Sequence, residues 1–150
     1  MIEAAGADQA DLLAGLHAAA FDQPWTAAEI AELMENSAVF AILSRRGEAA
    51  QGFAMGWAAA GDAELLTVAV SPEARRRGVG ASLVTAAGVT ALVRGAASMH
   101  LEVAEDNEAA RALYKKLGYE ETGRRRGYYA TSRGWIDAIV MRRTLPRPFA

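Results

Sequence analysis

The chain has 150 residues, of which 52% are hydrophobic and 23% are charged, so it is long and apolar enough for one domain with a buried core, which argues against a disordered or fibrous segment. Its formal net charge of -2 gives no basic footprint for nucleic acid, and the absence of cysteine excludes disulfides, thiolate metal sites and acyl-cysteine intermediates. No apolar run approaches the ~20 residues of a membrane span, and the acidic N-terminal segment is unlike a secretory signal, so we expect a cytoplasmic protein without membrane contacts.

Helical patterns begin near the N-terminus. Apolar residues recur at helical spacing within residues 8–20, and Thr26 followed by Glu29 has the form of a capping box before a second helix that ends near residue 36. A third helix is expected directly after the glycines of RRRGVG, where Gly88 costs about 1 kcal/mol relative to alanine and weakens the helix.

The fourth predicted helix, residues 108–117, carries signals at both ends. Asn107 is a suitable N-cap. Lys115 and Lys116 complement the negative end of the helix dipole, and Gly118 can adopt the left-handed closing conformation. Start and stop signals therefore agree on one short helix.

Six segments have the pattern of β-strands, and polar turns at residues 45–48 and 131–134 predict two hairpins. One of the six is almost continuously apolar, as expected for a strand covered on both faces. The predicted strands are residues 39–44, 52–59, 63–70, 99–103, 119–129 and 135–143. Because no repeat or linker interrupts this order, we expect a single domain over residues 1–150, with a flexible tail from about residue 145.

The order strand, glycine turn, helix at RRRGVG predicts an anion site. Several backbone amides and the positive end of a helix dipole converge there, which is a geometry that binds pyrophosphate. Gly78 and Gly80 would allow the turn and the close approach of the backbone. An ordinary strand-to-helix turn is the alternative, because a bare GxG is common. The third glycine of a dinucleotide fingerprint and the Lys-Ser or Lys-Thr pair of a triphosphate loop are both missing.

This loop resembles the central motif of the GNAT acetyltransferase superfamily, which is Arg or Gln, two residues, Gly, one residue, then Gly or Ala. The order of elements is similar over nearly the whole chain. The resemblance implies an α/β (α+β) fold with a mixed, mostly antiparallel sheet of about six to seven strands and about four helices, and acetyl-CoA as co-substrate. The implied contacts to the CoA arm and pyrophosphate are Val68, Ala69, Val70, Arg76, Arg77, Gly78, Val79, Gly80, Ala81 and Asn107.

Within the superfamily, four segments resemble the RimI-type enzymes. They are PW at residues 24–25, TVAVSPEARRRGVG, LEVAEDNEAARALYKKLGY and RRRGYYATSRGWIDAIVM. The resemblance implies acetylation of the N-terminal alanine of a ribosomal protein by direct attack on the thioester, without a metal. It also implies that Glu102 is the general base and Tyr114 the general acid.

Chemistry makes both roles reasonable. An α-amino group has a pKa of about 8 and must lose a proton before it attacks, whereas a tyrosine with a pKa of about 10 stays protonated and can donate to the departing thiolate. Each residue also has an ordinary interpretation. Glu102 would be a solvent-facing strand residue, Tyr114 a core aromatic residue and Asn107 only a helix cap.

The resemblance assigns acceptor binding to Trp25, Tyr128 and Tyr129, although strand alternation allows only one of the two tyrosines to face a groove. The arginines at residues 124–126 are interpreted as a solvated surface, and His100 as a packing residue rather than a metal ligand.

Other functions remain open at this point. A small-molecule amine or lysine acetyltransferase would need a closed acceptor pocket, and a non-catalytic acyl-CoA sensor would bind the cofactor without turnover. Glu105 and Asp106 make the turn before the fourth helix acidic, which would favour a basic peptide or keep the CoA phosphates at a distance.

Overall fold

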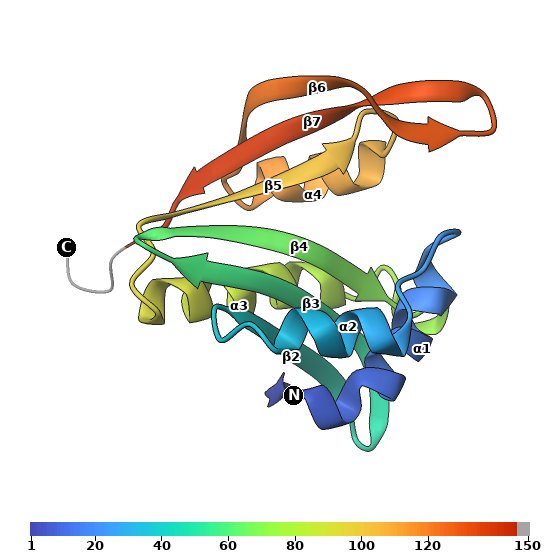
Figure 1. Ribbon diagram of the computed structural model, residues 1–150, viewed down its shortest axis with the longest axis vertical. Helices are drawn as coiled ribbons and strands as arrows, with labels where there is room; N and C mark the ends of the chain where they lie inside the picture. Colours follow the sequence, from blue (N-terminus) through green and yellow to red (C-terminus); the bar gives the residue numbers. More distant parts are fainter. Residues whose placement is uncertain (147–150) are drawn as a thin grey trace.

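Seven strands form one sheet in the order β1-β2-β3-β4-β5-β7-β6 in the computed structural model, which describes residues 1–146 (Figure 1). Neighbouring strands are antiparallel except for β4 and β5, which are parallel. The predicted mixed, mostly antiparallel sheet is therefore confirmed. The strands are β1 (Ile2–Ala5), β2 (Val39–Arg46), β3 (Ala49–Ala59), β4 (Asp62–Val70), β5 (Ser98–Ala104), β6 (Glu120–Thr131) and β7 (Gly134–Thr144).

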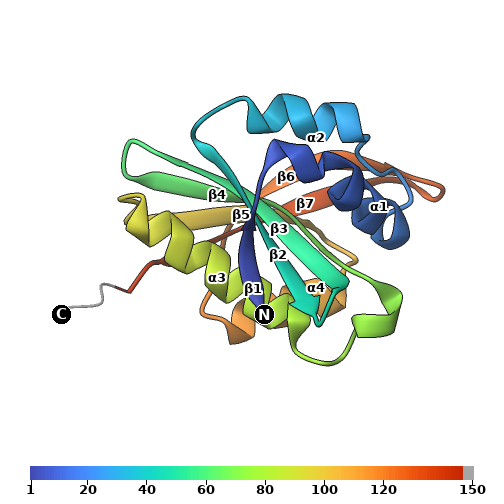
Figure 2. The ribbon, with the colours of Figure 1, turned by 90° about the horizontal axis from the view of Figure 1, so that it is seen from below.

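Two helices cover each face of the sheet (Figure 2). One face carries α1 (Ala10–Ala20) and α2 (Ala27–Met34), and the other carries α3 (Val79–Val93) and α4 (Glu108–Lys116). Within residues 1–146, no helix is long and apolar enough to cross a membrane.

Local signals in the sequence explain where α2 and α4 begin. The Glu29 amide donates to Thr26 Oγ1 at 3.1 Å while the Thr26 amide donates to Glu29 Oε1 at 3.2 Å, so the predicted capping box is present. Asn107 Oδ1 accepts from the Ala110 amide at 3.2 Å, and Gly118 closes α4 with a φ of 96°. Both capping predictions are confirmed.

Two predictions at the ends of the chain were wrong. β1 was not expected, because its four residues carry no turn signal; its strand state comes from pairing with residues 41–44 of β2. Leu145 was placed in a flexible tail, yet its side chain is 4% exposed and its amide donates to the Ala97 carbonyl at 2.9 Å. The rest of the predicted tail, residues 147–150, lies outside the described part of the chain.

The core has two parts, one on each face of the sheet, and β4 contributes to both. Leu65 and Val68 pack with α3 on one face, while Leu66 and Ala69 pack on the α1 side. Gly56 pairs with Leu65 and the neighbouring Met55 pairs with residue 67, so Leu66 forms a β-bulge. The prediction that this strand is covered on both faces is confirmed.

Gly88 lies buried in α3. A Cβ added there would meet Leu145 Cδ2 at 3.5 Å, an ordinary van der Waals contact. The helix runs through this glycine without interruption, so packing compensates for its low helix propensity.

Candidate active site

β4 and β5 diverge after a short parallel contact. They pair only from Asp62 with Ser98 to Glu64 with His100, and then separate toward their C-terminal ends (Figure 1). Beyond Glu64, β4 stays paired with β3 on one side, while no described strand pairs with its other edge. The predicted CoA-arm residues 68–70 lie on this open edge, where backbone groups are free to bind an extended ligand.

The glycine loop, residues 75–81, follows the end of β4. Arg76 and Gly78 have φ angles of 65° and 79°, both in the left-handed region. Such a conformation costs a non-glycine residue about 1–3 kcal/mol and is common at ligand clamps. The Ser82 amide donates the first helical hydrogen bond to the Gly78 carbonyl at 3.0 Å, so the amides of residues 79–81 have no partner within α3. These amides and the helix dipole make the loop suitable for an anion.

The two glycines of the motif differ in backbone conformation and in the space around them. Gly78 caps α3 in the left-handed conformation, which glycine adopts without strain. Gly80 lies inside the first turn of α3, and a Cβ added there would meet Leu113 at 3.5 Å and Val70 at 3.8 Å, both ordinary contacts. The protein itself therefore tolerates a side chain at residue 80, and any need for glycine there must come from a ligand.

Glu102 projects from β5 on the face opposite to α3 and α4. Its neighbours Leu101 and Val103 are buried in the core on the α3 side, so strand alternation turns Glu102 the other way. Its side chain is 17% exposed, and Arg125 Nε lies 2.8 Å from Glu102 Oε1. Arg125 is exposed, as the interpretation of the arginine run as a solvated surface predicts, but it also pairs with Glu102, and the pattern does not reveal a partner on another strand.

Tyr129 lies near this carboxylate, whereas Tyr114 on α4 packs against the core on the α3 side, with its ring 6.0 Å from that of Tyr119. Burial, and then the neighbouring Tyr119 and Tyr129, raise the pKa of Tyr114 to about 12. Burial, and then the negative charge of Glu102, also raise the pKa of Tyr129. Tyr129 therefore interacts with Tyr114 and with Glu102, and the joint action of Glu102 and Tyr114 stays a prediction.

The rings of Tyr128 and Tyr129 contact each other, with centroids 5.1 Å apart and an interplanar angle of 83°, because the register shift between residues 125 and 129 interrupts regular strand alternation. Tyr128 is 48% exposed, and its ring faces the Arg125 guanidinium with a centroid distance of 5.2 Å. Tyr129 is half-buried and interacts with Glu102. Both tyrosines therefore lie beside Arg125, and Tyr129 is the less exposed of the two.

Trp25 lies apart from this cluster, at the end of the loop between α1 and α2. Its backbone amide donates to His17 Nδ1 at 3.0 Å, and the two rings stack with centroids 4.8 Å apart. The indole also lines a hollow of about 550 Å³, together with Glu29, Glu32, Leu33, Asn36 and Val39. No sequence pattern singles out His17, because a lone histidine on an amphipathic helix carries no signal of its partners.

His100 lies where β4 and β5 still pair. Its Nε2 is 3.2 Å from Glu64 Oε1 and its Nδ1 is 3.7 Å from Asp62 Oδ1. The edge of the Trp57 ring approaches its imidazole, and the Trp57 indole donates to Glu64 Oε2 at 3.2 Å. His100 therefore packs against Trp57, as expected, and is in addition a partly exposed residue with two carboxylate neighbours. Within residues 1–146, no group of three or more potential ligands is arranged to hold a metal ion.

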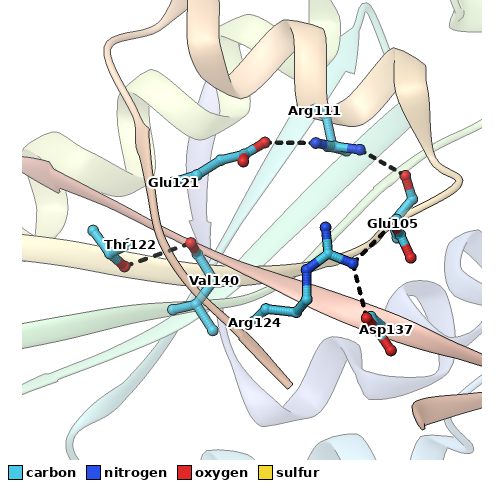
Figure 3. A network of polar contacts seen from close by, with 7 residues as sticks. All are labelled: Glu105, Arg111, Glu121, Thr122, Arg124, Asp137 and Val140. Carbon is cyan, nitrogen blue, oxygen red and sulfur yellow. Dashed lines mark hydrogen bonds and ion pairs between the residues drawn. The ribbon is translucent and has the colours of Figure 1, made fainter. Parts of the chain in front are cut away.

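A polar network ties β6 and β7 to α4 (Figure 3). Arg124 Nη1 donates to Glu105 Oε1 and to Asp137 Oδ2, both at 2.8 Å. Arg111 donates to the Glu105 carbonyl at 2.9 Å and to Glu121 at 2.6 Å. Arg124, like Arg125, is therefore ion-paired rather than simply solvated. Its guanidinium meets the charge of Glu105, the first residue of the acidic turn.

The Arg124 guanidinium and the Gly127 amide hold the pKa of Asp137 below its ordinary value. Opposite this aspartate, β6 departs from regular register between residues 125 and 129, and Gly127 has a φ of 58°. A bulge of this kind re-aims side chains, and it separates Arg125 from Tyr129 beside the candidate site.

Comparisons with known proteins agree with this geometry. Residues 10–119 match the family described as Acetyltransferase (GNAT) family. A ribosomal protein bS18-alanine N-acetyltransferase from Escherichia coli is 36% identical over 118 residues, which cover 79% of each chain. The enzyme of that name from Salmonella typhimurium is 42% identical over 80 residues, so the match spans about half of that relative, 54% of its length. The crystal structure of the ribosomal-protein-S18-alanine N-acetyltransferase from Escherichia coli superposes with a TM-score of 0.91 and 28% identity, covering 98% of this chain and 94% of that one.

Proposed function

This chain belongs to the acetyltransferase (GNAT) family and uses acetyl-CoA as its acyl donor, and we propose that it transfers the acetyl group to the α-amino group of an N-terminal alanine on a ribosomal protein. The names of its relatives supply the acceptor class. An acceptor of that class would be met in the cytoplasm.

The contact between Glu102 and Arg125 carries the proposal. A carboxylate on β5, beside the opening between β4 and β5, holds a cationic nitrogen at 2.8 Å. A peptide ammonium offers the same charge and hydrogen-bonding hydrogens as that guanidinium nitrogen. We therefore expect the acceptor ammonium to displace Arg125 and to give its proton to Glu102.

Three steps follow in the proposed reaction. Glu102 removes a proton from the ammonium, whose pKa in a free peptide is about 8, and leaves a neutral amine. The amine nitrogen forms a bond to the thioester carbonyl carbon. The carbon–sulfur bond then breaks, the CoA thiolate leaves, and the second nitrogen proton is lost as the amide forms. No covalent enzyme intermediate is needed, and alignment of the two reactants can lower the barrier by ~7 to 11 kcal/mol.

Tyr114 acts at the sulfur. Its pKa of about 12 lies above that of a thiol, about 8.5, so complete proton transfer to the thiolate is unfavourable. Its hydroxyl stays protonated throughout the physiological range and can donate a hydrogen bond as charge develops on sulfur. We expect this hydrogen bond to be its main contribution, and solvent to complete the protonation.

The co-substrate would lie along the open edge of β4 and over the glycine loop. The amides of residues 76–81 would bind the pyrophosphate and residues 68–70 would pair with the pantetheine arm. Asn107 uses its Oδ1 to cap α4, which leaves its amide NH₂ available to the same arm. Trp25, Tyr129 and Tyr128 would line the acceptor side.

The test measures CoA release with three acceptors. They are a basic peptide that begins with alanine, the same peptide with a blocked N-terminus and an internal lysine, and a mixture of small amines. Turnover only with the free alanine terminus supports the proposal. Turnover only with lysine or small amines would move the acceptor to another class, and binding of acetyl-CoA without turnover on any of the three would contradict the proposed acceptor.

A further inference from the structure

His17 holds both ends of the loop between α1 and α2. Its carbonyl accepts from the Phe21 amide at 3.0 Å, and its ring Nδ1 accepts from the Trp25 amide, also at 3.0 Å. The side chain lies in the last turn of α1 and is only 3% exposed. The intervening residues 22–24 are exposed, so this single buried residue fixes the path of the connection.

The hydrogen bond from Trp25 determines the tautomer of the imidazole. Because Nδ1 accepts a hydrogen bond, a neutral ring carries its own proton on Nε2. Nε2 lies 3.2 Å from Thr67 Oγ1 and can donate to it. Thr67 follows the bulged Leu66 and precedes the open-edge residues 68–70. One ring therefore connects the loop of residues 21–25 to the part of β4 that is proposed to bind acetyl-CoA.

Stacking holds the imidazole plane. The Phe21 and Trp25 rings lie 4.3 Å and 4.8 Å from the His17 centroid, with interplanar angles of 23° and 15°. Phe53 of β3 approaches at 6.1 Å. Such contacts fix the ring orientation, so the two nitrogens are aimed by packing as well as by hydrogen bonds.

Electrostatics favours the neutral ring. Burial lowers the pKa of His17 below 6.5, and the negative charge of Glu29 on α2 opposes this shift. The side chains that approach from β3 and β4, Phe53 and Thr67, carry no charge. At pH 7 the ring is therefore neutral, and Nδ1 is free to accept.

We propose that neutral His17 is a positioning residue that sets the loop of residues 21–25, and Trp25 with it, for acceptor binding. This inference rests on the proposed function, in which Trp25 contacts the acceptor. The essential part is Nδ1 as a hydrogen-bond acceptor, because without it the part-buried Trp25 amide loses its partner and the loop can leave its binding geometry.

Two substitutions separate the two ring nitrogens. His17→Asn places an acceptor oxygen near Nδ1 and loses the donor to Thr67, whereas His17→Gln keeps a donor near Nε2 and loses the acceptor for Trp25. For His17→Gln we expect the KM for the alanine peptide to rise roughly tenfold, the ratio that an unmade hydrogen bond at a buried group produces. The kcat and the Kd for acetyl-CoA should change by less than about twofold. His17→Asn should restore most of the peptide KM.

Leu16→Ala is the matched control, because Leu16 is a neighbouring buried residue of α1, whereas the hydrogen bond of the Trp25 amide goes to His17. It should lower the melting temperature and leave the peptide KM unchanged. Equal KM increases in His17→Gln and Leu16→Ala, or a loss confined to kcat, would overturn the proposal.

Amide hydrogen exchange at Trp25 provides a readout that needs no acceptor. Exchange should accelerate in His17→Gln and remain slow in His17→Asn, even if the alanine peptide is not the acceptor. Unchanged exchange in His17→Gln would contradict the positioning role, whatever the substrate is.

The dependence of the peptide KM on pH provides a further test. As the pH falls below 6.5, protonation removes the Nδ1 acceptor, so the peptide KM should rise more in the wild type than in His17→Asn. Parallel profiles would argue against the inference.

Discussion

The glycine loop and the β6–β7 hairpin border the same candidate site but are built in different ways. The loop works through backbone: two left-handed residues and the unpaired amides at the start of α3. The hairpin works through side chains: β6 is exposed over nearly its whole length, and Arg124 and Arg125 pair with carboxylates on other elements. Backbone geometry depends on local sequence, whereas side-chain pairs depend on the tertiary fold. The two regions should therefore fail separately when they are mutated.

The largest effect is expected at Glu102, which pairs with Arg125 of the hairpin. Glu102→Gln keeps the shape of the side chain but removes the base, so kcat should fall by roughly 100-fold to 10,000-fold, the usual contribution of general acid–base catalysis. Steady-state kinetics measure kcat, and titration with acetyl-CoA measures its Kd. The Kd for acetyl-CoA should stay unchanged, and an unaltered kcat would remove Glu102 from the mechanism.

A smaller effect is expected from Gly80→Ala in the glycine loop. The new methyl group meets protein atoms only at ordinary distances, so the melting temperature should hold while the Kd for acetyl-CoA rises by about tenfold or more, because the backbone can no longer approach the phosphate. Gly78→Ala is the comparison. Because Gly78 has a left-handed φ of 79°, this substitution should weaken acetyl-CoA binding and also lower the free energy of unfolding by about 1–2 kcal/mol. If Gly80→Ala binds acetyl-CoA normally, residue 80 does not lie against the cofactor.

The difference between local backbone geometry and side-chain pairs across the fold also explains which features the sequence could predict. Helix caps at Thr26 and Asn107 involve residues three positions apart, and the patterns predicted both correctly. The pair of Arg125 with Glu102 and the contact of His17 with Thr67 join residues 23 and 50 positions apart. No local pattern distinguishes such an arginine or histidine from a solvated one, because its partner is chosen by strand order and register.

A third effect concerns stability alone. Tyr119 is 2% exposed, and its hydroxyl has no hydrogen-bond partner in the described part of the chain. Tyr119→Phe removes this unsatisfied group, so we expect a gain of about 1 kcal/mol in the free energy of unfolding and of about 2–4 °C in melting temperature. Calorimetry of Tyr119→Phe and of the matched Tyr114→Phe checks the cause. Tyr114→Phe should show no such gain, and destabilisation by Tyr119→Phe would indicate a hydrogen bond to buried water.

The smallest effect is expected from Arg124→Ala in the hairpin network. Arg124 and the Gly127 amide lower the pKa of Asp137, and Arg111 lowers that of Glu121. A lowered folded-state pKa contributes stability above the ordinary carboxyl pKa, about 3.8 for Asp137, and this contribution is lost as the pH falls through the lowered value. The melting temperature of the wild type should therefore decline more steeply than that of Arg124→Ala between pH 4 and about pH 2.5, with a small difference because exposed ion pairs are weak. Arg133→Ala is the control, since Arg133 makes no ion pair within residues 1–146. If the melting temperatures of the wild type, Arg124→Ala and Arg133→Ala fall in parallel, the network adds nothing to stability. Its role would then be to orient Arg125 and Tyr129 toward the site, and a lower kcat of Arg124→Ala would reveal this role.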